Sequence, residues 1–226
     1  MAFFYNLMHE KKFLEYDTEL WQEAPVKEVN TLQLFITNRC NLRCKGCFYQ
    51  SRLGKGEISF SEYREYVLNY KSEIDKLILL GGEPTLHKDL QQMISFNQAE
   101  GLKTTIYTNG TNLENLEGIS LDGVGVRIGV HGVYSSEKPL VKVPQTSLPV
   151  TIVYMLDRGN SKELFDAAKI AEQDFNCSDF YISSIRDIAQ THNYLLDTIN
   201  TIPVDEYFII VQNFITKYDG KLNLHI

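Results

Sequence analysis

The chain has 226 residues, enough for one large domain or two small ones, and its 43% hydrophobic and 23% charged residues are ordinary for a globular protein. Its 22 Lys and Arg against 29 Asp and Glu give a formal charge of −7, which argues against a general binder of nucleic acid or of anionic membranes. No basic leader with an apolar stretch is visible, and no apolar run approaches the ~18 residues that span a bilayer, so we expect a cytoplasmic protein without membrane association.

The first elements divide the chain into an extension and a main domain. Residues 1–30 are expected to form an N-terminal extension with a short amphipathic helix within 10–23, and residues 31–226 the main domain. Alternating apolar residues over 32–37 predict a strand. Ser59 and Glu62 form a capping-box pattern that predicts a helix to about residue 70. The apolar run over 77–80 is typical of a parallel strand covered on both faces.

The rest of the chain continues this alternation of strands and helices. Strands are expected over 104–108, 124–130, 150–156, 180–185 and 221–226, and helices over 88–100, 113–116, 161–174 and 203–218. Strands that alternate with helices about six times predict an α/β fold with a parallel sheet and the helices outside it. Six units are too few for a closed eight-stranded barrel, so we expect a partial (β/α)6 barrel with ligand sites at the carboxyl ends of its strands.

Three of the four cysteines lie close together after the first strand. Cys40, Cys44 and Cys47 have the spacing Cys-x3-Cys-x2-Cys, while Cys177 stands alone. Clustered cysteines in a cytoplasmic chain indicate a metal site more than disulfides. Three thiolates can hold three irons of a [4Fe–4S] cluster, which leaves the fourth iron open to a bound molecule.

Zinc is the alternative that this spacing leaves open. Three cysteines and one histidine can hold a structural zinc ion, and His87 and His131 are the nearest histidines along the chain, although neither has a usual zinc-finger spacing. A non-catalytic zinc-binding module is therefore a second hypothesis from a different functional class.

Two further motifs follow the next two strands. Residues 81–84 read GGEP: Gly81 and Gly82 allow close backbone approach, Glu83 offers an anionic acceptor and Pro84 stiffens the turn. An ordinary strand-to-helix turn is the simpler reading. Residues 108–110 read TNG, which suits a tight turn.

Together these motifs resemble the radical S-adenosylmethionine (SAM) superfamily over most of residues 31–226. The resemblance implies that Cys40, Cys44 and Cys47 ligate a [4Fe–4S] cluster whose open iron chelates the amino and carboxylate groups of SAM. It also implies that the GGEP residues engage the SAM amino group, with Thr108 and Asn109 as weaker candidates for cofactor contact. Gly46 departs from the family, which often has an aromatic or bulky residue near the adenine there; Phe48 and Tyr49 are candidates to replace it.

The strand over 124–130 and its successors supply the remaining candidates. Arg127, Gly129 and His131 are expected on the inner face of the barrel. Arg127 is a candidate for the SAM carboxylate, for an acidic substrate group or for a plain ion pair. Arg127 and His131 are the candidate catalytic side chains, although a structural hydrogen bond at the strand end is the favoured interpretation of His131. Many relatives have a ribose-binding Ser where Gly129 stands. Ser183 lies where backbone contacts to adenine are common, and Asn160 is expected to cap the following helix.

The resemblance also implies a reaction. A low-potential donor such as flavodoxin or ferredoxin would supply an electron for reductive cleavage of SAM, and the 5′-deoxyadenosyl radical would abstract hydrogen from a peptide or small-molecule substrate. The alternative is an activase that installs a glycyl radical on a partner protein.

Overall fold

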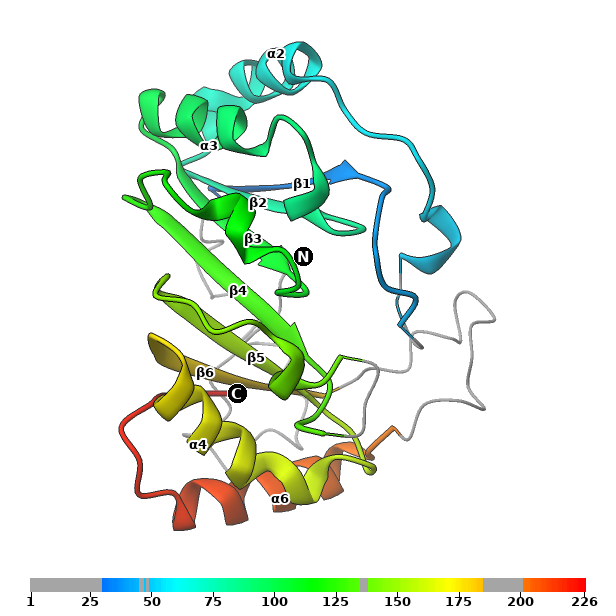
Figure 1. Ribbon diagram of the computed structural model, residues 1–226, viewed down its shortest axis with the longest axis vertical. Coiled ribbons are helices and arrows are strands. Elements are labelled where there is room, and N and C mark those ends of the chain that lie inside the picture. Colours follow the sequence, from blue (N-terminus) through cyan, green and yellow to red (C-terminus); the bar gives the residue numbers. More distant parts are fainter. Residues whose placement is uncertain (1–29, 45–46, 48, 135–137, 185–200) are drawn as a thin grey trace, which may run out of the picture.

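The computed structural model describes residues 30–44, 47, 49–134, 138–184 and 201–226, and it contains a seven-stranded parallel sheet (Figure 1). The strands are β1 (Thr31–Thr37), β2 (Lys76–Gly81), β3 (Lys103–Thr108), β4 (Val124–Val130), β5 (Val150–Leu156), β6 (Cys177–Ser184) and β7 (Asn223–His225), in the spatial order β1 to β7. The expected extension, Gly46 and Phe48 lie outside the described residues, apart from Asn30. Because β1 and β7 lie at opposite ends of this order, the expected open, partial barrel is confirmed.

Helices cover one face of the sheet in two groups (Figure 1). The α-helices are α2 (Phe60–Tyr70), α3 (Leu90–Ala99), α4 (Leu164–Asp174) and α6 (Val204–Lys217). Short 3-10 helices are η1 (Gln50–Arg52), η2 (Lys71–Glu73), η3 (Pro84–Leu86), η4 (Leu113–Leu116), η5 (Leu140–Lys142) and η6 (Ser161–Glu163). Helices α2 and α3 lie on the side of β1–β3, and α4 and α6 on the side of β5 and β6. None of the helices in the described part of the chain is both long and apolar enough to cross a membrane.

Local sequence signals explain where several elements begin. The capping box of α2 is present: Ser59 Oγ accepts from the Glu62 N–H, and the Glu62 carboxylate accepts from the Ser59 N–H at 2.9 Å. The expected cap by Asn160 is wrong, because its side chain makes no cap bond to the helix. Instead the buried Asn160 amide donates to the carbonyls of His131 and Met155, which joins the ends of β4 and β5.

The alternation along β4 separates core from inner face as the sequence predicts. Its four outward residues, Val124, Val126, Ile128 and Val130, are buried in the hydrophobic core beneath the helices. Arg127 and Gly129 lie on the other face and are partly exposed.

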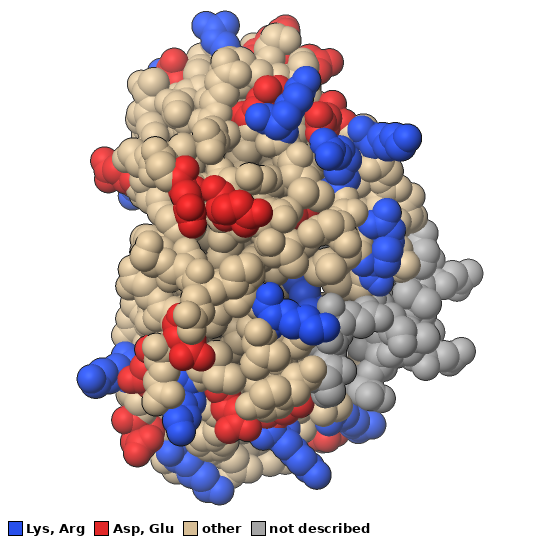
Figure 2. Space-filling view, viewed as in Figure 1, with Lys and Arg blue, Asp and Glu red and all other residues tan. Residues whose placement is uncertain are grey.

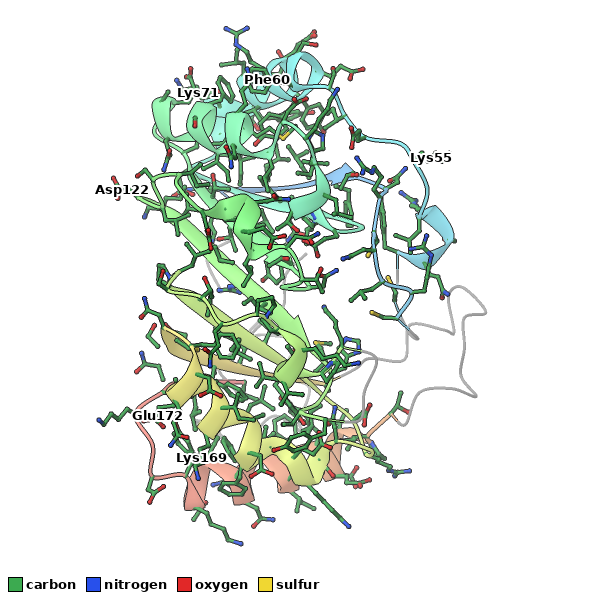
Figure 3. All side chains as sticks on the ribbon, in the orientation of Figure 1. Lys55, Phe60, Lys71, Asp122, Lys169 and Glu172 are labelled. Carbon is green, nitrogen blue, oxygen red and sulfur yellow. The ribbon has the colours of Figure 1, made fainter. Side chains whose placement is uncertain are left out.

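Parallel pairing brings all the predicted motifs to one edge of the sheet. The cysteine loop follows β1, GGEP follows β2, TNG closes β3 and His131 follows β4. In Figure 3, Lys55 marks the side of the cysteine loop, and Asp122, just before β4, marks the opposite edge.

Candidate functional site

The cysteine loop presents three half-buried thiols. The Cys47 N–H donates to the Cys44 carbonyl at 3.3 Å, and the Leu42 N–H donates to Cys40 Sγ at 3.4 Å. Burial raises the pKa of the Cys40 thiol, and the charges of Glu83 and Cys47 raise it further, while the Leu42 N–H opposes them. A bound metal ion stabilises thiolates that lie close to other negative groups in this way.

The three thiols are ligands of the type that holds an iron–sulfur cluster, but they are not arranged closely enough to coordinate a single metal ion. Among the described residues, no three His, Cys, Asp or Glu side chains are gathered closely enough to hold a metal ion. The donor set nevertheless fits an iron–sulfur cluster, because three thiols in one loop at the carboxyl end of a strand leave one iron of a cube open.

The two glycines after β2 bring the backbone of that turn against the cysteine loop. The Gly82 N–H donates to the Thr37 carbonyl and the Glu83 N–H donates to the Arg39 carbonyl, both at 2.7 Å. A Cβ on Gly82 would overlap the Arg39 carbonyl and lie 2.9 Å from the Cys40 Cβ. The glycines are therefore required here for the close approach of two backbones.

Glu83 joins the ends of β2 and β3. The residue is 1% exposed, and its carboxylate accepts four hydrogen bonds: from the Thr85 N–H and Oγ1 at 3.1 and 2.7 Å, from Thr108 Oγ1 at 2.6 Å and from the Asn109 N–H at 2.6 Å. These bonds compensate the burial of its charge. The structure gives Glu83 a role in tying GGEP to TNG, and its predicted contact with the SAM amino group stays a prediction.

A polar network joins the TNG turn to the cysteine loop. Asn109 Nδ2 donates to Asn41 Oδ1 at 2.9 Å, and Asn41 Nδ2 donates to Thr111 Oγ1 at 2.7 Å. The Asn109 amide oxygen accepts from the N–H and the hydroxyl of Thr111. Asn41 lies between the first two cysteines, so three strand ends form one connected cradle.

Lys138 brings an amine to the same region. Its Nζ lies 3.1 Å from where a Cβ on Gly129 would be, on the inner side of β4. Burial lowers the pKa of Lys138, while the charges of Cys44, Glu83 and the other two loop cysteines act in the opposite direction. The amine therefore shares its surroundings with the three thiols and the buried carboxylate.

His131 lies beside this lysine. Its N–H donates to the Lys138 carbonyl at 3.0 Å, and its own carbonyl accepts from Asn160. Burial, together with the charge of Lys138, lowers the pKa of His131 to about 4, so the imidazole is neutral at physiological pH.

Arg127 lies deeper on the inner face, between two tyrosines. Its guanidinium donates to the hydroxyls of Tyr107 and Tyr181 at 2.8 and 3.3 Å, and it stands 4.6 Å from the centre of the Tyr181 ring. Tyr181 in turn stacks on His225 of β7. These contacts place Arg127 among its neighbouring strands, and the ion pairs of the described residues do not include it.

The remaining predicted residues take separate positions. Ser183 pairs with Met155 near the carboxyl end of β6 and is partly exposed. Tyr49 stacks on Phe35 of β1 with ring centres 4.6 Å apart, and its hydroxyl donates to Asn38 at 2.6 Å. The ring of Tyr49 therefore packs on the first strand beside the cysteine loop.

Sequence reasoning missed three residues of this site: Asn41, Thr111 and Lys138. Asn41 and Thr111 lie within or directly after the recognised motifs, so a polar side chain at a strand end was the available signal. Lys138 lies in an irregular loop without periodicity, and only the fold brings it over β4.

Comparisons with known proteins match this arrangement. The family model of the radical SAM superfamily matches residues 34–182, more than half of the chain. The chain belongs to the radical SAM superfamily. Members of this superfamily are enzymes, and membership implies binding of an iron–sulfur cluster and SAM.

Individual radical SAM relatives share only part of their length with this chain. It is 32% identical to the Fe-coproporphyrin III synthase of Methanosarcina barkeri over 104 residues, which is 39% of this chain and 26% of the relative. It is 35% identical over 85 residues to a Methanocaldococcus jannaschii protein named as a glycyl-radical enzyme activating enzyme, 36% of this chain and 32% of the relative. The crystal structure of Streptococcus suis SuiB bound to its precursor peptide SuiA has a TM-score of 0.67 at 15% identity, covering 87% of this chain and 48% of SuiB. The chain thus spans less than half of each of these proteins.

Proposed function

We propose that Cys40, Cys44 and Cys47 hold a [4Fe–4S] cluster and that the protein cleaves SAM reductively, so that the resulting 5′-deoxyadenosyl radical abstracts hydrogen from a peptide or a small molecule. When bound, the cluster would supply the electron that breaks a carbon–sulfur bond of SAM. A flavodoxin or ferredoxin would supply that electron, in a cytoplasm that keeps the thiols reduced. The observation that carries the proposal is the cradle in which GGEP and TNG are bonded to the cysteine loop.

The residues of the cradle would divide the recognition of SAM among them. The backbone of Gly81, Gly82 and Pro84 would border the amino group, with the Glu83 charge behind it. The charges of the loop cysteines act on the Lys138 amine, whereas Arg127 donates to two tyrosine hydroxyls, so Lys138 is better placed than Arg127 to attract the SAM carboxylate. Thr108 and Asn109 would hold the turn that borders the cofactor, and Ser183 would border the adenine.

Arg127 and His131 would then serve the substrate side of the inner face. The two tyrosine hydroxyls fix the Arg127 guanidinium, so it presents a preorganised cation to an acidic substrate group. His131 is neutral and lies at the end of β4, where it can donate or accept a single hydrogen bond.

A second candidate is activation of a glycyl-radical enzyme. The 35% identity to the M. jannaschii protein named as such an activating enzyme favours it. In that case the hydrogen donor would be a glycine of a partner protein, and the chemistry at SAM would be the same.

The test is anaerobic reconstitution with iron and sulfide, followed by reduction, addition of SAM and measurement of 5′-deoxyadenosine. Wild-type protein and a Cys177→Ala variant should bind about four irons and form the product, because Cys177 lies apart on β6. A Cys40→Ala variant should lose both. Retention of zinc in place of iron, or equal product from the Cys40 variant, would contradict the proposal.

The same assay separates the two enzyme candidates. Enhanced 5′-deoxyadenosine formation with a peptide or metabolite supports the first. Formation of a glycyl radical on an added partner enzyme, detected by electron paramagnetic resonance, supports the second.

A further inference from the structure

The segment around the cysteines carries a charge opposite to that of the rest of the chain. Residues 38–56 contain five Lys and Arg and no Asp or Glu. That leaves 17 of the 22 Lys and Arg against all 29 Asp and Glu elsewhere, a formal charge of −12 outside this segment. A net acidic protein therefore has its most basic stretch at its proposed redox centre.

The described cations of this segment are exposed. Arg39, Arg43, Arg52 and Lys55 all have exposed side chains, and we call these four residues the basic arc. Figure 2 shows basic side chains along the upper right of the molecule, where Figure 1 places the segment between β1 and α2. Glu57 neutralises only part of this charge, through a 3.5 Å ion pair with Arg39.

Two members of the basic arc also hold the loop, and two do not. Arg43 donates to the carbonyls of Cys40 and Leu42 at 2.8 and 2.9 Å, and the Arg39 carbonyl accepts from Glu83. Arg52, at the end of η1, and Lys55, in the loop before α2, have no such part in the cradle. Charge at these two positions can therefore be changed without cutting the bonds that fix the thiols.

We propose that the basic arc is the docking surface for an acidic protein electron donor. The inference rests on the proposed function, because it assigns the surface by which an electron would reach the cysteine loop. A donor that docks here covers the loop that carries the thiols and thus shortens the path to them. The −12 charge elsewhere repels an acidic partner, so attraction to the basic arc also sets its orientation.

The transfer itself is a one-electron step. The reduced flavin or iron–sulfur group of the donor loses one electron and the cluster of this protein gains one. No bond is made or broken at this point, and no proton has to cross the interface. Docking therefore needs proximity and orientation, which charge complementarity supplies.

The experiment measures association with a purified acidic flavodoxin. An Arg52→Glu/Lys55→Glu variant reverses two charges of the basic arc. A matched Lys169→Glu/Lys221→Glu variant makes the same change in net charge at exposed positions elsewhere, and Figure 3 shows Lys169 far from Lys55. Association of the reconstituted proteins is followed at about 0.01 M and about 1 M salt, where the Debye length is about 30 Å and about 3 Å.

The expected result is association about tenfold slower or more for the arc variant at low salt, with the matched variant much less affected. The difference should disappear at high salt. Equal association of all three proteins, equal losses in the two variants, or binding of a short single-stranded RNA but not of flavodoxin would overturn the proposal.

A chemical reductant keeps the two proposals apart. With dithionite as the electron source, the arc variant should form 5′-deoxyadenosine as fast as wild type, because docking is bypassed. No product from wild type would refute the proposed function, while the flavodoxin-binding arm would still decide whether the basic arc docks an acidic protein.

Discussion

A single buried carboxylate organises the candidate site at the scale of residues. Glu83 accepts hydrogen bonds from β2's own turn and from the end of β3. The motif indicated an acidic residue at a ligand site, but two of its hydrogen-bond donors, Thr108 and Asn109, are 25 and 26 residues away along the chain and come close only when the strands pair. The spacing of the motifs therefore identified Glu83 as a site residue but did not predict its hydrogen-bond partners.

Replacing Glu83 by Gln should destabilise the fold. The amide keeps the size, but it removes the charge and turns one acceptor into a donor, so a buried N–H or hydroxyl loses its partner. The free energy of unfolding should fall by about 3 kcal/mol, measured by denaturant titration. The exposed Glu114→Gln variant should change little. Unchanged stability with loss of SAM binding would show that Glu83 serves the cofactor alone.

The neutral state of His131 predicts a pH dependence of stability. Its pKa falls from 6.5 to about 4 on folding, so the unfolded chain binds the proton more tightly and stability decreases as the pH falls from about 6.5 to about 4. Between about pH 7.5 and about pH 5 this contribution is about 2 kcal/mol. Denaturant titrations of iron-free protein at these two pH values measure the free energy of unfolding. Between them it should fall by about 2 kcal/mol more in wild type than in the His131→Asn variant. Parallel pH profiles would contradict the assignment.

At the scale of elements, regular strands and helices followed closely from sequence periodicity. β4 and β5 have the predicted bounds, and α6 differs from its prediction by one residue at each end. The sequence placed the start of β6 three residues too late, because Ser178 and Asp179 interrupt the apolar pattern. Sequence periodicity could not predict the contacts between loops, since those of Asn41 and Lys138 depend on which loops the sheet brings together.

The glycine turn after β2 gives a prediction at this scale. Gly82→Ala should push the cysteine loop away from β2, because the new Cβ would overlap the Arg39 carbonyl. We expect iron retained after reconstitution to fall to less than about half of wild type. Gly54→Ala is the matched control, since its Cβ would lie 4.0 Å from the nearest atom. Equal iron content in the two variants would disprove the steric account.

At the scale of the whole molecule, stability should be graded across the open sheet. The central strands β3, β4 and β5 have a neighbour on each side, while β7 is a three-residue edge strand held by its pairing with β6, the Asp179–His225 contact and the Tyr181–His225 stack. The class of fold followed from the alternation of strands and helices. The shortness of β7 did not, because its apolar residues extend beyond the pairing.

Hydrogen exchange should reveal this gradient. Amides of β3–β5 should exchange only through global unfolding, whereas those of β7 should exchange through a local opening of lower free energy. Mass spectrometry of peptides from the native protein in deuterated buffer measures the difference. Protection of β7 equal to that of β4 would mean that the edge strand is part of the cooperative core.

The Lys138 amine above Gly129 shows that a strand position and a distant loop position occupy one volume. A Cβ at 129 would lie 3.1 Å from the Lys138 amine, so a side chain there would require the amine to shift by a few tenths of an ångström. A comparison of single positions with the superfamily pattern, which often has a Ser where Gly129 stands, shows at this position only the loss of a side chain. In this chain the polar group at that place comes from Lys138, nine residues after Gly129. Redesign of this part of the site should therefore treat residues 129 and 138 together.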